Sequence, residues 1–207
     1  MTTGQTVTLN GTLTAVVADT SGDPEIVVSP LTTLAASLAR AASGGATAAN
    51  ITAANTQVAA LFGGSFDLLA TKPVDMTVMD TAMIDADVAD YTLAIAAFSQ
   101  LAADLALSPS QLLSQLERDI RDGRLDGRNG TTTVGAESSI TKRLARALMT
   151  IQQSTNNNRG LTLQQATIDA VLASDGEIAG TALTGLDTIA PQVIEVFPSS
   201  RATMVST

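Results

Sequence analysis

Apolar residues recur at every second position near the start of the chain, and at every third or fourth position through most of the remainder. Val7, Leu9 and Leu13 alternate with threonines, which is typical of β-strands. Asn10-Gly11 lies between two such runs, and this dipeptide favours the tight turn of a hairpin. The pattern therefore predicts an N-terminal β-hairpin over residues 5–17, followed by a third short strand over residues 25–28.

Six later stretches carry apolar residues at helical spacing. Ser-Pro pairs open the first and the fourth, because Ser caps a helix and Pro suits its first turn. Gly-Gly pairs end the first and the second. The predicted helices begin after Ser29, at Ala48, at Thr81, after Ser108, after Ser138 and after Thr162.

The third predicted helix, residues 81–105, has the longest apolar seam. Ile84, Val88, Tyr91, Ile95 and Phe98 follow one another at alternating intervals of four and three residues. Such spacing keeps all five side chains on one face of the helix. We therefore expect this helix to lie at the centre of a bundle as its least exposed member, with Phe98 in the core.

These elements together predict a mainly α fold, a bundle of about six helices with a small N-terminal β-hairpin element and a C-terminal strand. The strand is expected over residues 192–197, where apolar residues alternate again. The expected division is residues 1–28 for the hairpin element, as the tail of a preceding β domain. Residues 29–174 form the bundle, and residues 175–207 form a linker and the first strand of an Ig-like domain.

Composition restricts the partners of this bundle. Hydrophobic residues make up 45% of the chain and aromatic residues only 2%, so the core must consist of Ala, Leu, Ile and Val. The net charge is −9, which repels a phosphate backbone, and few aromatic rings are present to stack on bases. We expect no nucleic-acid binding and, because no apolar run is long enough, no membrane insertion.

The chain contains neither Cys nor His. Zinc, haem, iron–sulfur and copper sites therefore lack their usual ligands, and a serine or cysteine triad lacks its usual base. No other pattern of residues indicates a catalytic site, so we expect a protein that is not an enzyme and that carries no cofactor other than a calcium ion.

The calcium candidate is a glycine-rich acidic loop with oxygen ligands at short intervals, Asp119, Asp122, Asp126 and Asn129. Calcium takes six to eight oxygens from flexible loops of this kind. The spacing departs from the EF-hand pattern, because no acid follows two residues after Asp122 and no Glu closes the loop. The alternative interpretation is a helix that ends at Asp122-Gly123 and continues into a turn.

A second acidic group, Asp80, Asp85, Asp87 and Asp90, lies at the start of the third predicted helix. Two carboxylates at a fixed separation can hydrolyse glycosidic bonds. Acidic residues at a helix N-terminus also interact favourably with the helix dipole, and the remainder would form a solvated face. A polysaccharide hydrolase with two facing acids therefore remains a low-ranking alternative.

Three stretches resemble parts of bacterial surface proteins. LDTIAPQVIEVFPSS, from Leu186 onward, resembles the opening strand of the Ig-like domains found in tandem in cell-surface and S-layer proteins. GTLTAVVADTSGDPEIVVSPLTTLAASLA, from Gly11, resembles the junction of a β-sandwich repeat with a helical segment in such proteins. LAADLALSPSQLLSQLERDIRDGRLDGRNG, from Leu101, resembles the middle of those helical segments.

This resemblance implies an exported protein at the bacterial cell surface, such as an adhesin or a surface-layer component. The first residues, MTTGQTVTLNG, lack the basic and apolar regions of a signal peptide, so the resemblance alone implies export. The leading hypothesis is a non-catalytic helical spacer whose partners are neighbouring Ig-like domains of the same polypeptide. The alternative is a filament subunit, a homo-oligomer joined through its terminal strands by strand addition.

Overall fold

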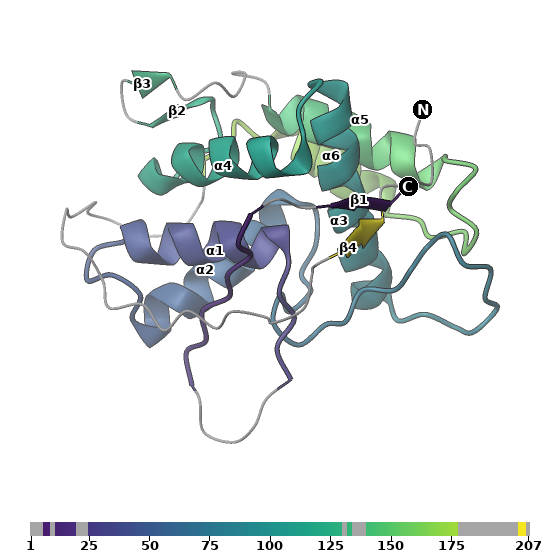
Figure 1. Cartoon of the computed structure of the whole chain (residues 1–207), viewed down its shortest axis with the longest axis horizontal. Helices are drawn as coiled ribbons and strands as arrows, with labels where there is room; N and C mark the ends of the chain where they lie inside the picture. Colours follow the sequence, from purple (N-terminus) through teal and green to yellow (C-terminus); the bar gives the residue numbers. More distant parts are fainter. Residues whose placement is uncertain are drawn as a thin grey trace.

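The computed structural model describes residues 6–8, 11–19, 25–129, 132–133, 140–177 and 203–205. These residues form a mainly α bundle of six helices, which confirms the predicted fold class (Figure 1). The helices are α1 (Pro30–Ala41), α2 (Ala48–Leu61), α3 (Ala86–Asp104), α4 (Pro109–Asp119), α5 (Ile140–Gln152) and α6 (Gln165–Ala173). A 3-10 helix, η1 (Ile120–Asp122), and four short strands complete the order: β1 (Thr6–Thr8), β2 (Arg128–Asn129), β3 (Thr132–Thr133) and β4 (Thr203–Val205).

The helices pack mainly in pairs. α1 packs on α2, α3 on α5, and α5 on α6, while α4 contacts both α1 and α3. Figure 1 shows α1 and α2 at the lower left and α5 and α6 at the upper right, with α3 between them. Ala and Leu dominate the buried residues, and Tyr91, Phe62 and Phe98 are the largest fully buried side chains.

Tyr91 of α3 connects three segments at the edge of this core. Its hydroxyl lies 2.7 Å from the Ser29 hydroxyl at the start of α1 and donates to the Leu68 carbonyl at 3.2 Å. Its ring stacks on Phe66 with a centroid separation of 4.7 Å. Burial raises the pKa of Tyr91 to about 12, so the phenol stays protonated and keeps its hydrogen bond.

The two helix starts predicted from serine caps, after Ser29 and after Ser108, are confirmed. The Ser29 hydroxyl accepts a hydrogen bond from the Thr32 amide, and the Thr32 hydroxyl accepts one from the Ser29 amide. Ser108 and Gln111 form the same reciprocal pair at the start of α4. Each capping box satisfies two backbone amides that the first turn leaves unpaired, which is why α1 and α4 begin where the sequence predicts.

The predicted start of the third helix at Thr81 is wrong. α3 begins at Ala86, because Asp85 has an extended backbone and its carboxylate accepts a hydrogen bond from the Asp87 amide. Asp85 is therefore the cap rather than an interior residue of the helix.

The predicted cap of the sixth helix, Thr162, is also wrong. α6 begins at Gln165, because the side chain of Asn157 holds the preceding segment in place. Its Nδ2 donates to the Leu161 carbonyl, and its Oδ1 accepts from the Leu161 amide. The Leu163 amide donates to the Gln152 side chain at 3.1 Å. Leu161 and Leu163 are buried in an extended stretch, so they reach the core without being helical.

The expectation that the third helix is the least exposed is not met. In α1 ten of twelve residues are buried, whereas in α3 eleven of nineteen are. The N-terminal segment contributes to the burial of α1, because Leu13 is only 5% exposed and the Thr14 amide donates to the Thr33 hydroxyl of α1 at 2.9 Å. Residues 11–19, which precede the boundary expected after residue 28, therefore contact α1.

β1 does not pair with the second strand of the predicted hairpin. It pairs antiparallel with β4, with Thr6 opposite Val205 and Thr8 opposite Thr203. Residues 11–19, which include most of the second predicted hairpin strand, contain no strand. The C-terminal strand expected over residues 192–197 lies outside the described residues. β2 and β3 form a second pair, with Asn129 opposite Thr132.

Candidate functional site

The four residues predicted to bind calcium surround one loop after α4. Asp119, the last residue of α4, is fully buried. Its Oδ1 accepts hydrogen bonds from the Gly127 amide at 2.9 Å and the Arg128 amide at 2.9 Å, and its Oδ2 lies 3.1 Å from the Gly127 amide. A carboxylate bound by two backbone amides fixes the loop to the end of the helix that precedes it.

The other three side chains bind the backbone of the same region. Asp122 accepts from the Arg124 amide at 3.1 Å, and Asp126 accepts from the Arg128 amide at 2.9 Å. The Asn129 side chain donates to the Arg118 carbonyl at 2.8 Å. Within the described residues, no group of three carboxylates is arranged to hold a metal ion. The calcium site stays a prediction, and the observed role of these side chains is to shape the loop.

Two further contacts dock this loop on the segment after α6. The Leu125 amide donates to the Gly176 carbonyl at 2.8 Å, and Arg124 forms an ion pair with Glu177 at 3.0 Å. Gly176 has a φ of +84°, and a Cβ there would lie 2.3 Å from the Leu125 carbonyl oxygen. Residues 175–177, which the sequence assigned to a linker, therefore pack on the bundle.

The carboxyl group of Asp119 has an unusual protonation equilibrium. Burial raises its pKa from 3.8 to about 6. The Gly127 and Arg128 amides counteract this shift, and the nearby carboxylates of Asp126 and Asp122 add to it. Asp119 therefore gains or loses its charge in a mildly acidic range, where ordinary carboxyl groups are already ionised.

We expect this group to make the chain less stable as the pH rises from about 4 to 6. The folded state, with the higher pKa, binds more protons than the unfolded state in that window, so deprotonation removes about 2–3 kcal/mol of stability. Urea unfolding of chelator-treated wild type and Asp119→Asn at several pH values measures this. The stability difference, wild type minus variant, should fall with rising pH; a flat or rising difference would contradict the shift.

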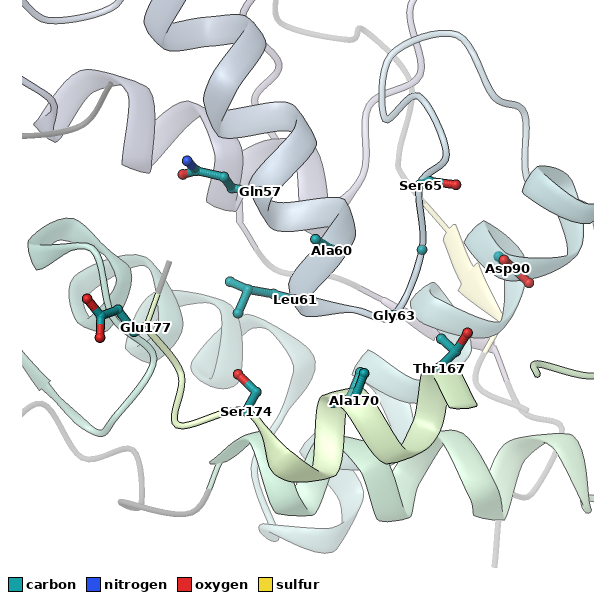
Figure 2. Close-up of a pocket in the computed structure, with 12 residues that line it drawn as sticks. Gln57, Ala60, Leu61, Gly63, Ser65, Asp90, Thr167, Ala170, Ser174 and Glu177 are labelled. Atoms are coloured by element: carbon teal, nitrogen blue, oxygen red, sulfur yellow. The ribbon is translucent and has the colours of Figure 1, made fainter. Parts of the chain in front are cut away.

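A cleft of about 470 Å³ lies between the end of α2 and α6 (Figure 2). Leu61 and Ala60 line it from α2, and Thr167 and Ala170 line it from α6. The two helices approach closely at Gly63, where a Cβ would lie 2.9 Å from the Thr167 methyl group. A side chain at Gly63 would therefore collide with α6, so glycine permits this close approach.

The two carboxylates of this cleft lie at opposite ends in Figure 2, Asp90 at the start of α3 and Glu177 after α6. Burial raises the pKa of Asp90, and the neighbouring Asp87 adds to the effect. Glu177 is paired with Arg124. Paired-carboxylate hydrolysis requires two facing acids, whereas Asp90 and Glu177 lie at opposite ends of the cleft; the hydrolase alternative stays a prediction.

The remaining acids of the second predicted cluster lie elsewhere. Asp80 pairs with Arg159 at 2.9 Å and accepts from the Ala82 amide at 3.0 Å. The amide, and then the guanidinium, lower the pKa of Asp80. Asp85 caps α3 as described above. The structure thus places Asp80 on a loop, Asp85 at a helix start and only Asp90 in the cleft.

The sequence did not predict that Asp90 lines the cleft apart from the other acids of its cluster. It also did not predict that Arg40 and Arg121 together line a smaller pocket between α1 and α4. Asp90 carries a sequence signal, because it precedes the buried Tyr91 and lies three residues before Leu93 on an apolar helix. Arg40 and Arg121 are 81 positions apart, and no local pattern connects them.

In the part of the chain that the structure describes, no single helix is long and apolar enough to cross a membrane. α3 and residues 109–122 together are long and apolar enough to span a membrane, by length and composition only. The chain bends by 101° between these two parts. Comparison of the chain with protein families, with curated proteins and with solved structures found no match in any of the three.

Proposed function

We propose that the chain is a non-catalytic structural module of an exported bacterial cell-surface protein, and that its two connections to the rest of the polypeptide emerge side by side. The observation that carries this proposal is the antiparallel pairing of β1 with β4. Paired strands lie about 5 Å apart, so the chain segments at β1 and β4 lie side by side. The bundle then projects from the path of the polypeptide rather than lengthening it.

This geometry refines the hypothesis of a helical spacer between β-sandwich domains. A spacer that sets distance needs its two connections at opposite ends, because a bundle separates its neighbours only by the span between its termini. A module with adjacent connections acts instead as a lateral projection between two neighbouring domains. The cell-surface location rests on the resemblance of residues 11–39, residues 101–130 and the stretch from Leu186 to bacterial surface proteins.

The packing of the bundle suits a mechanical role. Its core combines Ala and Leu side chains with four aromatic residues, Phe62, Phe66, Tyr91 and Phe98, and the N-terminal segment contacts α1. The loop after α4 and the segment after α6 are fastened to each other through Leu125 and Gly176. Such a unit transmits force through packed helices without a bound ligand.

A cysteine cross-link tests the proposal, because the natural chain contains no Cys. Thr8 and Thr203 lie opposite each other in the β1–β4 pair, and directly opposite residues have Cα atoms about 4.5–5.5 Å apart. That separation suits a disulfide. We expect the double variant Thr8→Cys/Thr203→Cys, oxidised at low protein concentration, to form an intramolecular disulfide and to migrate as a monomer on a non-reducing gel.

The single variants Thr8→Cys and Thr203→Cys are the matched controls, and neither should form an internal cross-link. Filament assembly by strand addition makes the opposite prediction for the double variant. Its disulfides would join different chains, and the cross-linked mass would grow with protein concentration. Cross-linking only between chains would therefore overturn the proposed module and favour the filament subunit.

A further inference from the structure

A small pocket lies between α1 and the segment formed by α4 and η1. It has a volume of about 290 Å³ and is lined by five residues, Ser37, Arg40, Ala41, Glu117 and Arg121. The first three are three and four positions apart on α1, and the last two are four positions apart, so each set shares one face of its helical segment. The two faces oppose each other across the contact between α1 and α4.

The polar groups of this pocket are only partly satisfied. The Ser37 hydroxyl donates to the Glu117 carboxylate at 2.9 Å. The Nη2 atom of Arg40 is buried and has no hydrogen-bond partner. Within the described residues, neither Arg40 nor Arg121 forms an ion pair with an acidic side chain. A guanidinium only donates hydrogen bonds, and the buried nitrogen is not paired with the carboxylate of Glu117, although Glu117 lines the same pocket.

The charge of the pocket indicates whether a singly or a doubly charged anion would bind there. Two guanidinium groups and one carboxylate leave a local charge of +1 in a chain whose net charge is −9. Arg40 lies in the last turn of α1, where the helix dipole is negative, and Glu117 would repel a dianion. A singly charged oxyanion balances the lining, whereas a doubly charged anion meets the Glu117 carboxylate. The volume lies at the lower limit of ligand pockets, so only a small group fits.

We propose that this pocket binds a monoanionic carboxylate, whose two oxygens accept hydrogen bonds from the guanidinium groups of Arg40 and Arg121. The planar guanidinium fork matches the geometry of a carboxylate. The carboxylate belongs either to a small free acid or to an Asp or Glu side chain of an exposed peptide. This site is independent of the proposed structural function, because it depends on α1 and α4 and not on the terminal strands.

Titration of the full chain with sodium propionate at pH 7 and constant ionic strength tests the site. Two-dimensional amide NMR should show saturable shifts at Ser37, Ala41 and Glu117, with a Kd on the order of 1–10 mM. Arg40→Met keeps an unbranched apolar stem but removes the guanidinium donors, and should weaken binding roughly 10-fold. Arg118→Met is the matched control, because Arg118 is exposed on α4 and its Nε donates to the Ser114 carbonyl. It should bind propionate as wild type does.

Arg121→Gln provides a second variant if Arg40→Met unfolds, because Arg121 is exposed and its replacement leaves the core intact. It too should weaken binding. A capped tetrapeptide containing one Asp distinguishes the sources: tighter binding than propionate assigns the site to peptide side chains, and equal or weaker binding assigns it to free acids. Shifts that do not saturate, equal binding by Arg40→Met and wild type, or tighter binding of sulfate than of propionate would overturn the proposal.

Discussion

Replacement of Phe98 by Ala is expected to lower the free energy of unfolding by about 3–5 kcal/mol. Phe98 is 0% exposed in α3, which packs along α5. Removing the ring loses its transfer free energy and leaves a cavity. Only 2% of the residues in this chain are aromatic, so few large side chains can move to fill that space. Urea unfolding followed by helical circular dichroism measures the loss.

Two variants make the Phe98 result interpretable. Phe98→Leu keeps most of the volume and should cost roughly 1–1.5 kcal/mol. Thr56→Ala, at an exposed position of α2, should change stability by no more than about 0.5 kcal/mol. A loss below about 1 kcal/mol for Phe98→Ala would place this side chain outside the core and would contradict the described packing.

Replacement of Asp119 by Ala is expected to cost about 2–3 kcal/mol at pH 7. The substitution leaves the buried Gly127 amide without its acceptor, whereas the Arg128 amide keeps its hydrogen bond to Asp126. The loop after η1 then loses its attachment to the end of α4. Urea unfolding gives the free energy, and hydrogen exchange of the Gly127 and Arg128 amides reports whether the loop opens locally.

Asp122→Ala and Asp126→Ala are the matched controls for Asp119→Ala. Each removes one carboxylate from the same loop, yet each carboxylate accepts from an exposed amide that water can satisfy. We expect both to cost less than about 1 kcal/mol. Equal losses for all three variants, together with a rise in the melting temperature of wild type on addition of calcium, would instead indicate a metal site that the three carboxylates share.

The acidic loop shows why the site was harder to predict than the fold. The spacing of Asp119, Asp122, Asp126 and Asn129 identified a loop rich in oxygen atoms, and the structure places all four side chains in that loop. Spacing does not reveal whether an oxygen points toward a cation or toward a backbone amide. The helix continues through η1, and the chain turns back at Gly123, where φ is +84°. That turn brings Gly127 over Asp119.

The fold class, and the helix starts that depend on neighbouring residues, could be predicted from the order of amino acids alone. Ser29 with Thr32, and Ser108 with Gln111, complete their capping boxes within three positions, so a local pattern is enough to place them. Apolar spacing likewise identified the buried faces of α1, α4 and α5, because helical periodicity relates residues only three and four positions apart.

Features that join distant parts of the chain became visible once the helices were packed together. The start of α6 depends on Asn157 and Gln152, which hold the preceding segment extended. The partner of β1 is β4, almost 200 positions later, rather than the nearby segment that the Asn10-Gly11 turn favours. Arg40 and Arg121 meet because α1 packs against α4 and η1. Hydrogen bonds and packing between distant segments leave no periodic trace in the sequence, because each depends on how the helices are arranged in space.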